Sequence, residues 1–240
     1  MSFWSLRGIR VLVTGGIHGI NSLVIKELEA LDAEVLIVDV EPTTDDRIIY
    51  ADLTNDIDRN RIVRQIHDRW GALDILVNNP ASASARPWAQ WLKHEAEKDD
   101  IEWSVSQSGI SRLANDLFDL LQKGNQAQVV NVTSEGGWFD PGTQTIMLMG
   151  YDGILDFTHN LASKWGPQNI RVNAITPMYF HAPTKKQEAM LAYPGRPEKH
   201  LERTFMQQIA AAVVFLATNR STALTGRCLA LDGWIYGLSI

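Results

Sequence analysis

The sequence predicts an α/β fold: a doubly wound parallel sheet of seven strands with helices on both faces. Short apolar, β-branched runs recur along the chain, and amphipathic segments of helical length separate them. A glycine-rich turn follows the first run and leads into the first of these amphipathic segments. The runs are almost continuously apolar, which is typical of parallel strands that are buried on both faces. Ligands of such folds bind at the carboxyl ends of the strands.

Seven apolar runs are the expected strands, each bounded by polar or turn-forming residues. They are residues 8–14, 34–39, 47–52, 73–79, 128–134, 170–176 and 227–232. Five segments with helical periodicity predict the helices that cover the sheet. They are Leu23–Leu31, Ile57–Trp70, Leu113–Leu121, Ile154–Trp165 and Met206–Ala217.

The length of 240 residues is that of one large α/β domain, and we assign residues 1–240 to it. Residues 179–204 differ from the rest because they combine proline, glycine and charged residues without a strand pattern. Long excursions of this kind in compact domains often cover a substrate. Residues 179–204 are therefore either a substrate loop or an ordinary surface loop.

The composition limits the function classes. Lys and Arg number 22 against 28 Asp and Glu, and the net charge of -6 predicts binding neither to nucleic acid nor to an acidic membrane surface. The single cysteine, Cys228, cannot form an internal disulfide, which favours a cytoplasmic protein. We expect no signal peptide and no membrane span, because no apolar run is long enough. The six histidines lack metal-ligand spacing, so no metal is expected.

The stretch VLVTGGIHGIN (11–21) follows the first strand and opens a helix. Glycines in this position let backbone amides approach a pyrophosphate, which then lies at the helix N-terminus. Asp39 ends the second strand, where a carboxylate accepts hydrogen bonds from ribose hydroxyls and repels a 2′-phosphate. A tight turn without a ligand would explain the glycines alone. The glycines and Asp39 together favour NAD(H) over NADP(H).

Four motifs make the chain resemble the short-chain dehydrogenase/reductase family. They are TGGIHGIN (14–21), NNPA (78–81), IRVNAITP (170–177) and ALTGRCLALDG (223–233). Together they span essentially the whole chain, in the order that the family has. The resemblance implies a Rossmann-like fold, a nicotinamide cofactor and oxidoreductase activity on a small-molecule substrate. It also implies a homodimer or a homotetramer.

The resemblance implies a set of cofactor-binding residues at the strand ends. They are Thr14, Gly15, His18, Gly19, Ile20, Asp39, Asp52, Leu53, Asn78, Pro177 and Phe180. Three residues depart from the family's pattern. Pro80 replaces an alanine and removes a backbone donor, and Met178 replaces a glycine. Asn21 replaces the third glycine of the turn, and we expect its side chain to push the helix away or to point at the phosphates.

The family's proton relay consists of a tyrosine, a lysine four residues later, a serine and an asparagine. Counting forward from the fifth strand and back from the sixth puts Met147 at the tyrosine position and Tyr151 at the lysine position. The motif NVTS (131–134) of the fifth strand keeps Ser134 as the serine, whereas a similar count from Gly109 puts Ser106 at the asparagine position. Lys164 is too far along the helix to substitute. A methionine thioether cannot transfer a proton, so the relay is degenerate.

Three residues remain as candidates for chemistry. Ser134 can orient a substrate oxygen, as the resemblance implies. Tyr151 either contacts the nicotinamide ribose or packs as an ordinary aromatic side chain. His181 follows the sixth strand and is either a substitute proton source or an exposed loop residue.

Three functions stay open. The first is an oxidoreductase that uses NAD(H) and a non-standard proton source on a small apolar or aromatic carbonyl or alcohol. The second is a non-redox enzyme, such as a lyase or dehydratase, on the same scaffold. The third is a catalytically inactive subunit that forms a hetero-oligomer with an active paralogue.

Overall fold

The computed structural model of the chain describes residues 5–16, 20–79, 108–132, 137–140, 145–148, 151–177 and 198–231. Seven parallel strands form one sheet in the order β3-β2-β1-β4-β5-β8-β9. The strands are β1 Arg10–Thr14, β2 Glu34–Asp39, β3 Ile48–Tyr50, β4 Ile75–Asn78, β5 Gln128–Val132, β8 Arg171–Pro177 and β9 Cys228–Leu231. The predicted sheet is confirmed, because six strands lie within predicted runs and β8 extends only one residue beyond its run, to Pro177.

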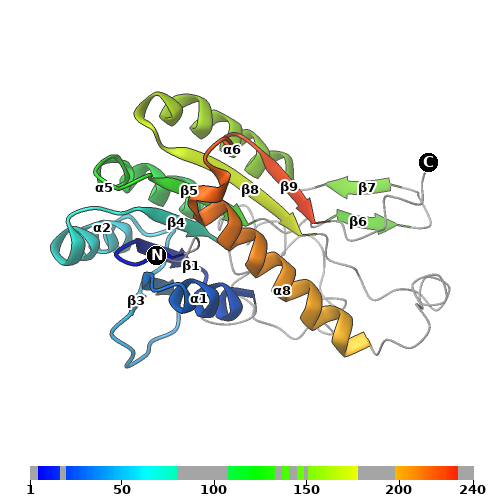
Figure 1. Cartoon of the computed structure of the whole chain (residues 1–240), viewed down its shortest axis with the longest axis horizontal. Coiled ribbons are helices and arrows are strands. Elements are labelled where there is room, and N and C mark those ends of the chain that lie inside the picture. The colour runs from blue at the N-terminus through cyan, green and yellow to red at the C-terminus, as the bar shows by residue number, and fades with distance from the viewer. Residues whose placement is uncertain are drawn as a thin grey trace.

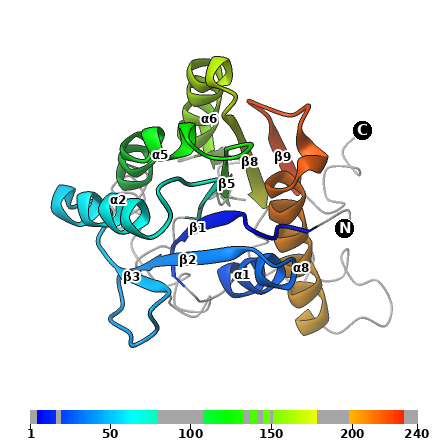
Figure 2. The same ribbon diagram turned by 60° about the vertical axis from the view of Figure 1, so that its left-hand side comes forward.

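Helices cover both faces of this sheet (Figures 1 and 2). They are α1 Ile20–Ala30, α2 Asp56–Trp70, α5 Phe118–Gln122, α6 Tyr151–Trp165 and α8 Glu198–Ala217, with residues 108–116 also helical and short 3-10 turns at Gly166–Gln168 and Asn219–Ser221. Helix α8 begins eight residues before the predicted start at Met206. Residues 198–204 of the predicted excursion are therefore helical, and residues 179–197 lie outside the described part.

Two hydrophobic clusters explain why the sheet holds helices on both faces. Along β1, the side chain of Leu12 packs into a cluster with α2, residues 113–121 and α6. Those of Val11 and Val13 pack into the opposite cluster with α1 and α8. All three side chains are fully buried. This alternation follows from the two-residue period of a strand, and burial on both faces explains the continuous apolar runs.

The ends of α2 follow local sequence signals. Asn55 is the N-cap, and its side-chain oxygen accepts a hydrogen bond from the backbone N–H of Ile57 at 2.8 Å. Gly71 ends the helix with a φ of 69°, in the left-handed region that favours glycine. Because the caps set where α2 begins and ends, they also set the direction in which the chain returns to β4.

A buried ion pair holds the amino ends of the central strands. The guanidinium of Arg10 donates to both carboxylate oxygens of Asp74 at 2.7 Å, and the Arg10 backbone N–H adds a third bond at 2.8 Å. The backbone N–H of Asn125 donates to the same carboxylate at 2.6 Å. The Asp74 side chain is 1% exposed. This cluster ties β1 to β4 and to the segment before β5, at the edge opposite the glycine turn.

A short antiparallel hairpin lies beside the sheet and was not predicted. Strand β6 (Gly137–Asp140) pairs with β7 (Thr145–Leu148), with Trp138 opposite Met147. In Figure 1 the hairpin lies to the right of the arrowheads of β8 and β9. Aromatic residues in β6 and the threonine and isoleucine of β7 favour extended backbone. Residue 147 is therefore extended, and α6 begins only at Tyr151.

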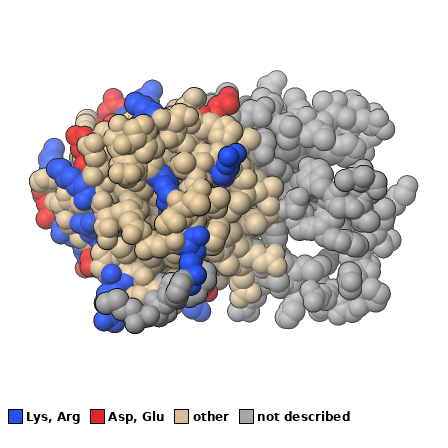
Figure 3. All heavy atoms as spheres, turned by 45° about the horizontal axis from the view of Figure 1, so that its top comes forward, with Lys and Arg blue, Asp and Glu red and all other residues tan. Residues whose placement is uncertain are grey.

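Charged side chains of both signs are interspersed over the described part of the face shown in Figure 3. Among the described helices, none combines the length and the apolar character needed to cross a bilayer. The described residues also contain no group of three or more His, Cys, Asp or Glu side chains that could hold a metal ion.

Candidate dinucleotide site

The site forms where the strand order reverses, between β1 and β4. Thr14 is the last residue of β1 and pairs with Asn78, the last residue of β4. The chain turns from β1 into α1, whereas β2 lies on the other side of β1 and ends at Asp39. Three carboxyl strand ends therefore lie together, at the edge where open α/β sheets bind ligands.

The glycine turn brings the backbone directly against Asp39. Gly15 and Gly16 have φ angles of 95° and 78°, which disfavour any residue with a side chain. The Gly16 N–H donates to the carbonyl of Val38 at 2.9 Å. A Cβ atom on Gly16 would lie 2.9 Å from Cγ of Asp39 and collide with its Oδ2. Only glycine permits this approach.

Gly16 was missed in the sequence, although the adjacent pair Gly15–Gly16 was a signal for it. The family pattern leaves that position open, so the pattern alone gave no reason to single it out. The requirement for glycine comes from Asp39, which is distant in the sequence but adjacent in the fold. His18 and Gly19 lie outside the described residues.

Asp39 is 9% exposed, and its Oδ1 accepts a hydrogen bond from the backbone N–H of Glu41 at 3.0 Å. This bond fixes the carboxylate at the end of β2, beside Gly16. Val40 follows it with 54% of its surface exposed. Neither Val40 nor Glu41 is basic, so the two residues after Asp39 contain no cation that could neutralise a 2′-phosphate.

The side chain of Asn21 binds two groups of the protein. It is 1% exposed, and Nδ2 donates to the carbonyl of Thr14 at 3.0 Å. Its Oδ1 accepts from Nδ2 of Asn79 at 2.8 Å. The expectation that this side chain points at the phosphates is wrong for a physical reason. Both ends of the amide find partners in β1 and after β4, so the polar group is satisfied inside the protein.

Asp52 and Leu53 follow β3 and have different surroundings. The Asp52 carboxylate accepts two hydrogen bonds from Thr54, from N and Oγ1, both at 2.8 Å. Leu53 is partly buried, and a Cβ atom on Gly109 would lie 2.9 Å from Cβ of Leu53. Arg59 donates to the Leu53 carbonyl at 2.8 Å. Leu53 is therefore held from two sides, whereas Asp52 forms a local turn.

Arg59 is itself held by two carboxylates. It is 5% exposed, with Nε donating to Asp116 at 2.9 Å and Nη2 paired with Asp56. Burial opposes the charge of Arg59 and would lower its pKa, but the hydrogen bonds to Asp116 and Asp56 outweigh that effect and raise the pKa. Arg59 therefore stays charged and links α2, Leu53 and the helix at 108–116.

The side chain of Asn78 binds Asn131 on the neighbouring strand β5. It is fully buried, and its Nδ2 donates to Oδ1 of Asn131 at 3.0 Å. Asn131 in turn donates to Oγ1 of Thr158 in α6 at 2.9 Å. Oδ1 of Asn78 has no hydrogen-bond partner among the described residues. The chain of amides links β4, β5 and α6 and leaves one buried acceptor open at the carboxyl end of β4.

Ser134, His181, Phe180 and Met178 lie outside the described residues. Tyr151 is the first residue of α6, and its side chain is outside the described part. Met147, which the count puts at the tyrosine position, lies in β7 and not in α6. Pro177 ends β8.

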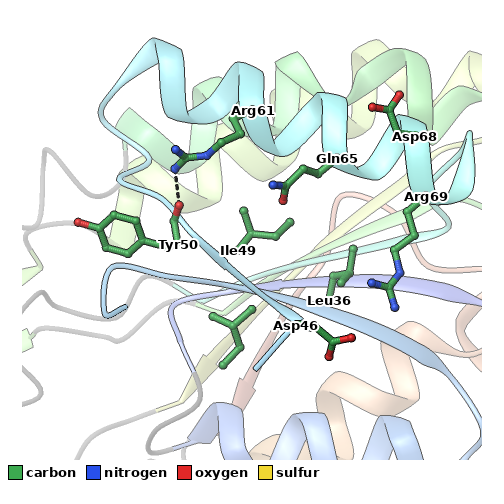
Figure 4. Close-up of a pocket in the computed structure, with 9 residues that line it drawn as sticks. Leu36, Asp46, Ile49, Tyr50, Arg61, Gln65, Asp68 and Arg69 are labelled. Atoms are coloured by element: carbon green, nitrogen blue, oxygen red, sulfur yellow. Dashed lines mark hydrogen bonds between the residues drawn. The ribbon is translucent and has the colours of Figure 1, made fainter. Parts of the chain in front are cut away.

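A separate hollow lies away from the glycine turn and from the carboxyl ends of β1 and β4. Nine residues line about 730 Å³ between the edge strand β3, β2 and one side of α2 (Figure 4). They are Leu36, Asp46, Ile48, Ile49, Tyr50, Arg61, Gln65, Asp68 and Arg69. Arg61 donates to the backbone carbonyl of Tyr50, so that outward-facing acceptor of β3 is already occupied.

A family model and several plant reductase homologs match this chain. A family model described as Enoyl-(Acyl carrier protein) reductase matches residues 18–235. A chloroplastic tropinone reductase homolog of Arabidopsis thaliana is 26% identical over 261 residues, covering 99% of this chain and 77% of its own. Another tropinone reductase homolog of that plant is 27% identical over 250 residues, covering 96% and 94%.

Solved structures show the same fold. A short chain dehydrogenase from Leptospira borgpetersenii, with bound NAD+, superposes with a TM-score of 0.73 at 25% identity, covering 95% of this chain and 92% of that one. The ligand-free aldohexose dehydrogenase of Thermoplasma acidophilum has a TM-score of 0.70 at 20% identity, covering 97% and 95%.

Proposed function

The chain belongs to the short-chain dehydrogenase/reductase family, and we propose that it binds NAD(H) in preference to NADP(H) for an oxidoreductase reaction. The contact between Gly16 and Asp39 carries this proposal. It brings the turn backbone beside a fixed carboxylate at the end of β2. A carboxylate in that position accepts hydrogen bonds from two ribose hydroxyls and repels a 2′-phosphate.

The described residues fit a nicotinamide dinucleotide. Gly15 and Gly16 keep the turn free of side chains where a pyrophosphate would approach the backbone. Asp39 would bind the adenosine ribose, and partly buried Leu53 would contact the adenine. The bound cofactor would supply or accept the hydride. The chain's own residues would hold it at the carboxyl strand ends and orient it toward the substrate.

We extend the proposal to a small apolar or aromatic carbonyl or alcohol. Ser134 would orient its oxygen, and His181 or Tyr151 would supply the proton. The support is the sequence position of each residue at the end of β5, after β8 and at the start of α6. Steady-state oxidation of NADH with a panel of such carbonyls tests this extension. A rate that is unchanged in Ser134→Ala and His181→Ala would remove both residues from the reaction.

An inactive partner subunit is a second candidate, favoured by one observation. Met147 lies in β7 opposite Trp138, outside α6, and cannot serve as a helical proton donor. Such a subunit would bind the nucleotide without turning it over. Size-exclusion chromatography with light scattering would separate this candidate from the cytoplasmic homodimer or homotetramer that we propose for the enzyme. An enzyme should assemble and turn over NADH without an added paralogue.

The deciding experiment is a calorimetric titration of the purified protein with NADH and with NADPH. We expect NADH to bind more tightly, and Asp39→Asn to narrow the difference by removing the charge that repels the 2′-phosphate. Glu27→Gln is the matched control, since it removes an exposed carboxylate on α1. Equal affinities in the unmodified protein would contradict the preference, and no binding of either nucleotide would overturn the proposed function.

A further inference from the structure

Asn21 closes a ring of three hydrogen bonds with Thr14 and Asn79. Nδ2 of Asn21 donates to the Thr14 carbonyl at 3.0 Å, and Oδ1 accepts from Nδ2 of Asn79 at 2.8 Å. The backbone N–H of Asn79 donates to Oγ1 of Thr14 at 3.3 Å and completes the ring. With Asn21 only 1% exposed, the ring is a buried connection between three segments.

The ring joins the residue before the glycine turn to a residue just after it. Thr14 is the last residue of β1, and Asn21 is in the first turn of α1. The chain between them includes Gly15 and Gly16, which have the greatest backbone freedom of any residue type. A bond from Asn21 back to Thr14 ties the two ends of this segment together. Asn79 ties the same point to the end of β4.

The chemistry of the side chain explains why an amide stands here. Only a side chain with both a donor and an acceptor at this length can bind a carbonyl on one side and an N–H on the other. Aspartate would place a second acceptor against the Thr14 carbonyl. With glycine at position 21, the Thr14 carbonyl and the side-chain amide of Asn79 would each lose one hydrogen bond. A buried group that loses its partner loses more than the bond itself is worth.

We propose that Asn21 is a positioning residue of the dinucleotide site, matched to Asn79. Through the ring it holds the glycine turn and the end of β4 in the arrangement that receives the pyrophosphate. This inference rests on the proposed binding of NAD(H). It has an unusual consequence: restoring the glycine that the family's pattern has at this position should weaken cofactor binding.

The test compares Asn21→Gly, Asn79→Ala and the double variant in the full chain. Calorimetry measures the binding of NADH, of ADP-ribose and of adenosine 5′-monophosphate, which lacks the second phosphate. Asn21→Gly should weaken NADH and ADP-ribose by about tenfold, the scale of one lost buried hydrogen bond, and the monophosphate by less. The double variant should bind as Asn21→Gly does, because both substitutions break the same ring.

A control separates this effect from helix destabilisation. Lys26→Gly puts a glycine on the exposed side of α1 and should leave all three affinities unchanged. If Asn21→Gly fails to fold, Asn79→Ala tests the same ring from a partly exposed position. The carboxylate of Asn79→Asp can no longer donate to Asn21. If this variant binds NADH as tightly as the unmodified protein does, the pairing is contradicted.

The outcomes distinguish this inference from the proposed function. If the unmodified protein binds NADH and Asn21→Gly binds it equally or better, the positioning role is overturned and the proposed function stands. A loss that is equal for the monophosphate and ADP-ribose would also overturn it, because a general structural defect would be the cause. If the unmodified protein binds no nucleotide, the proposed function fails, and the positioning role fails with it.

Discussion

The carboxylate of Asp39 occupies the space into which a side chain at position 16 would extend. Cγ of Asp39 would be 2.9 Å from a Cβ atom on Gly16, less than any ordinary contact between such atoms. A side chain at position 16 would therefore displace the carboxylate of Asp39. This relationship also connects the turn after β1 with the end of β2.

Gly16→Ala should lower NADH affinity by at least tenfold and destabilise the protein. The new methyl group must displace Asp39, and the alanine backbone must adopt a φ of 78°. Each of these strains costs roughly 1–3 kcal/mol. Gly8→Ala is the matched control, because Gly8 has a φ of 76° but a Cβ atom there would have no neighbour within 4 Å. Calorimetry and thermal melts compare the two. Equal losses of affinity would contradict a specific role for the Gly16–Asp39 contact.

Asp74→Asn should destabilise the protein by roughly 2–4 kcal/mol at pH 7, because it leaves the partly buried Arg10 without its counter-charge. Burial opposes ionisation of Asp74, but the hydrogen bonds from Arg10 and from the amides of Arg10 and Asn125 outweigh it and lower its pKa below the usual 3.8. Urea denaturation of both proteins measures the loss.

The pH dependence of this effect has a defined sign. Because the folded pKa of Asp74 is lowered, its contribution to stability is fully present above the unfolded pKa of about 3.8 and is lost as the pH falls toward the folded pKa. The difference between the unmodified protein and Asp74→Asn should therefore be constant from pH 7 to about pH 5 and shrink below about pH 4. A difference that grows in acid would contradict the ion pair.

Thr158→Val should cost roughly 1–3 kcal/mol of stability although the side chain keeps its shape. The substitution removes the hydroxyl that accepts from Asn131 at 2.9 Å, and it leaves a fully buried N–H without a partner. Thr158→Ser keeps the hydroxyl and should cost less than Thr158→Val. Chemical denaturation of the two variants checks the order. The reverse order would mean that packing of the methyl group outweighs the hydrogen bond.

Gly109→Ala should weaken the binding of adenosine 5′-monophosphate. A Cβ atom there would lie 3.0 Å from the backbone carbonyl carbon and oxygen of Leu53, so Leu53 must move. Leu53 is the apolar residue that we assign to adenine. Gly166→Ala is the control, because a Cβ atom on Gly166 would meet nothing within 4 Å. Calorimetric titration of both variants tests this, and unchanged binding in Gly109→Ala would remove Leu53 from the adenine site.

The sheet and most helix positions follow from patterns within short stretches of sequence. Strand β2 matches its predicted bounds of 34–39, and the other six strands fall at predicted runs with small changes at their ends. Hydrophobic periodicity is a property of consecutive residues, so it can be read locally. The same is true of Gly15 and of Asp39 at the end of its strand, whereas the requirement for glycine at position 16 depends on Asp39.

The strand at residues 145–148 could not be predicted in this way. The count that put Met147 at the tyrosine position uses sequence spacing alone, whereas residues 145–148 pair with residues 137–140 in the fold. Local propensity is a weak guide when a neighbouring strand can supply hydrogen bonds. The pairing partner, and not the residue itself, decides between strand and helix at this position.

Asn21 shows the difference most clearly. Its identity and its departure from a glycine pattern are evident in the chain, and so is its place at the start of a helix. Its partner Asn79 is 58 residues away, and the two side chains meet because β1 and β4 are adjacent in the sheet. A hydrogen bond requires two groups within about 3 Å, and only the folded arrangement brings these two together. The residue types are written in the sequence, whereas the connection between them exists only in the fold.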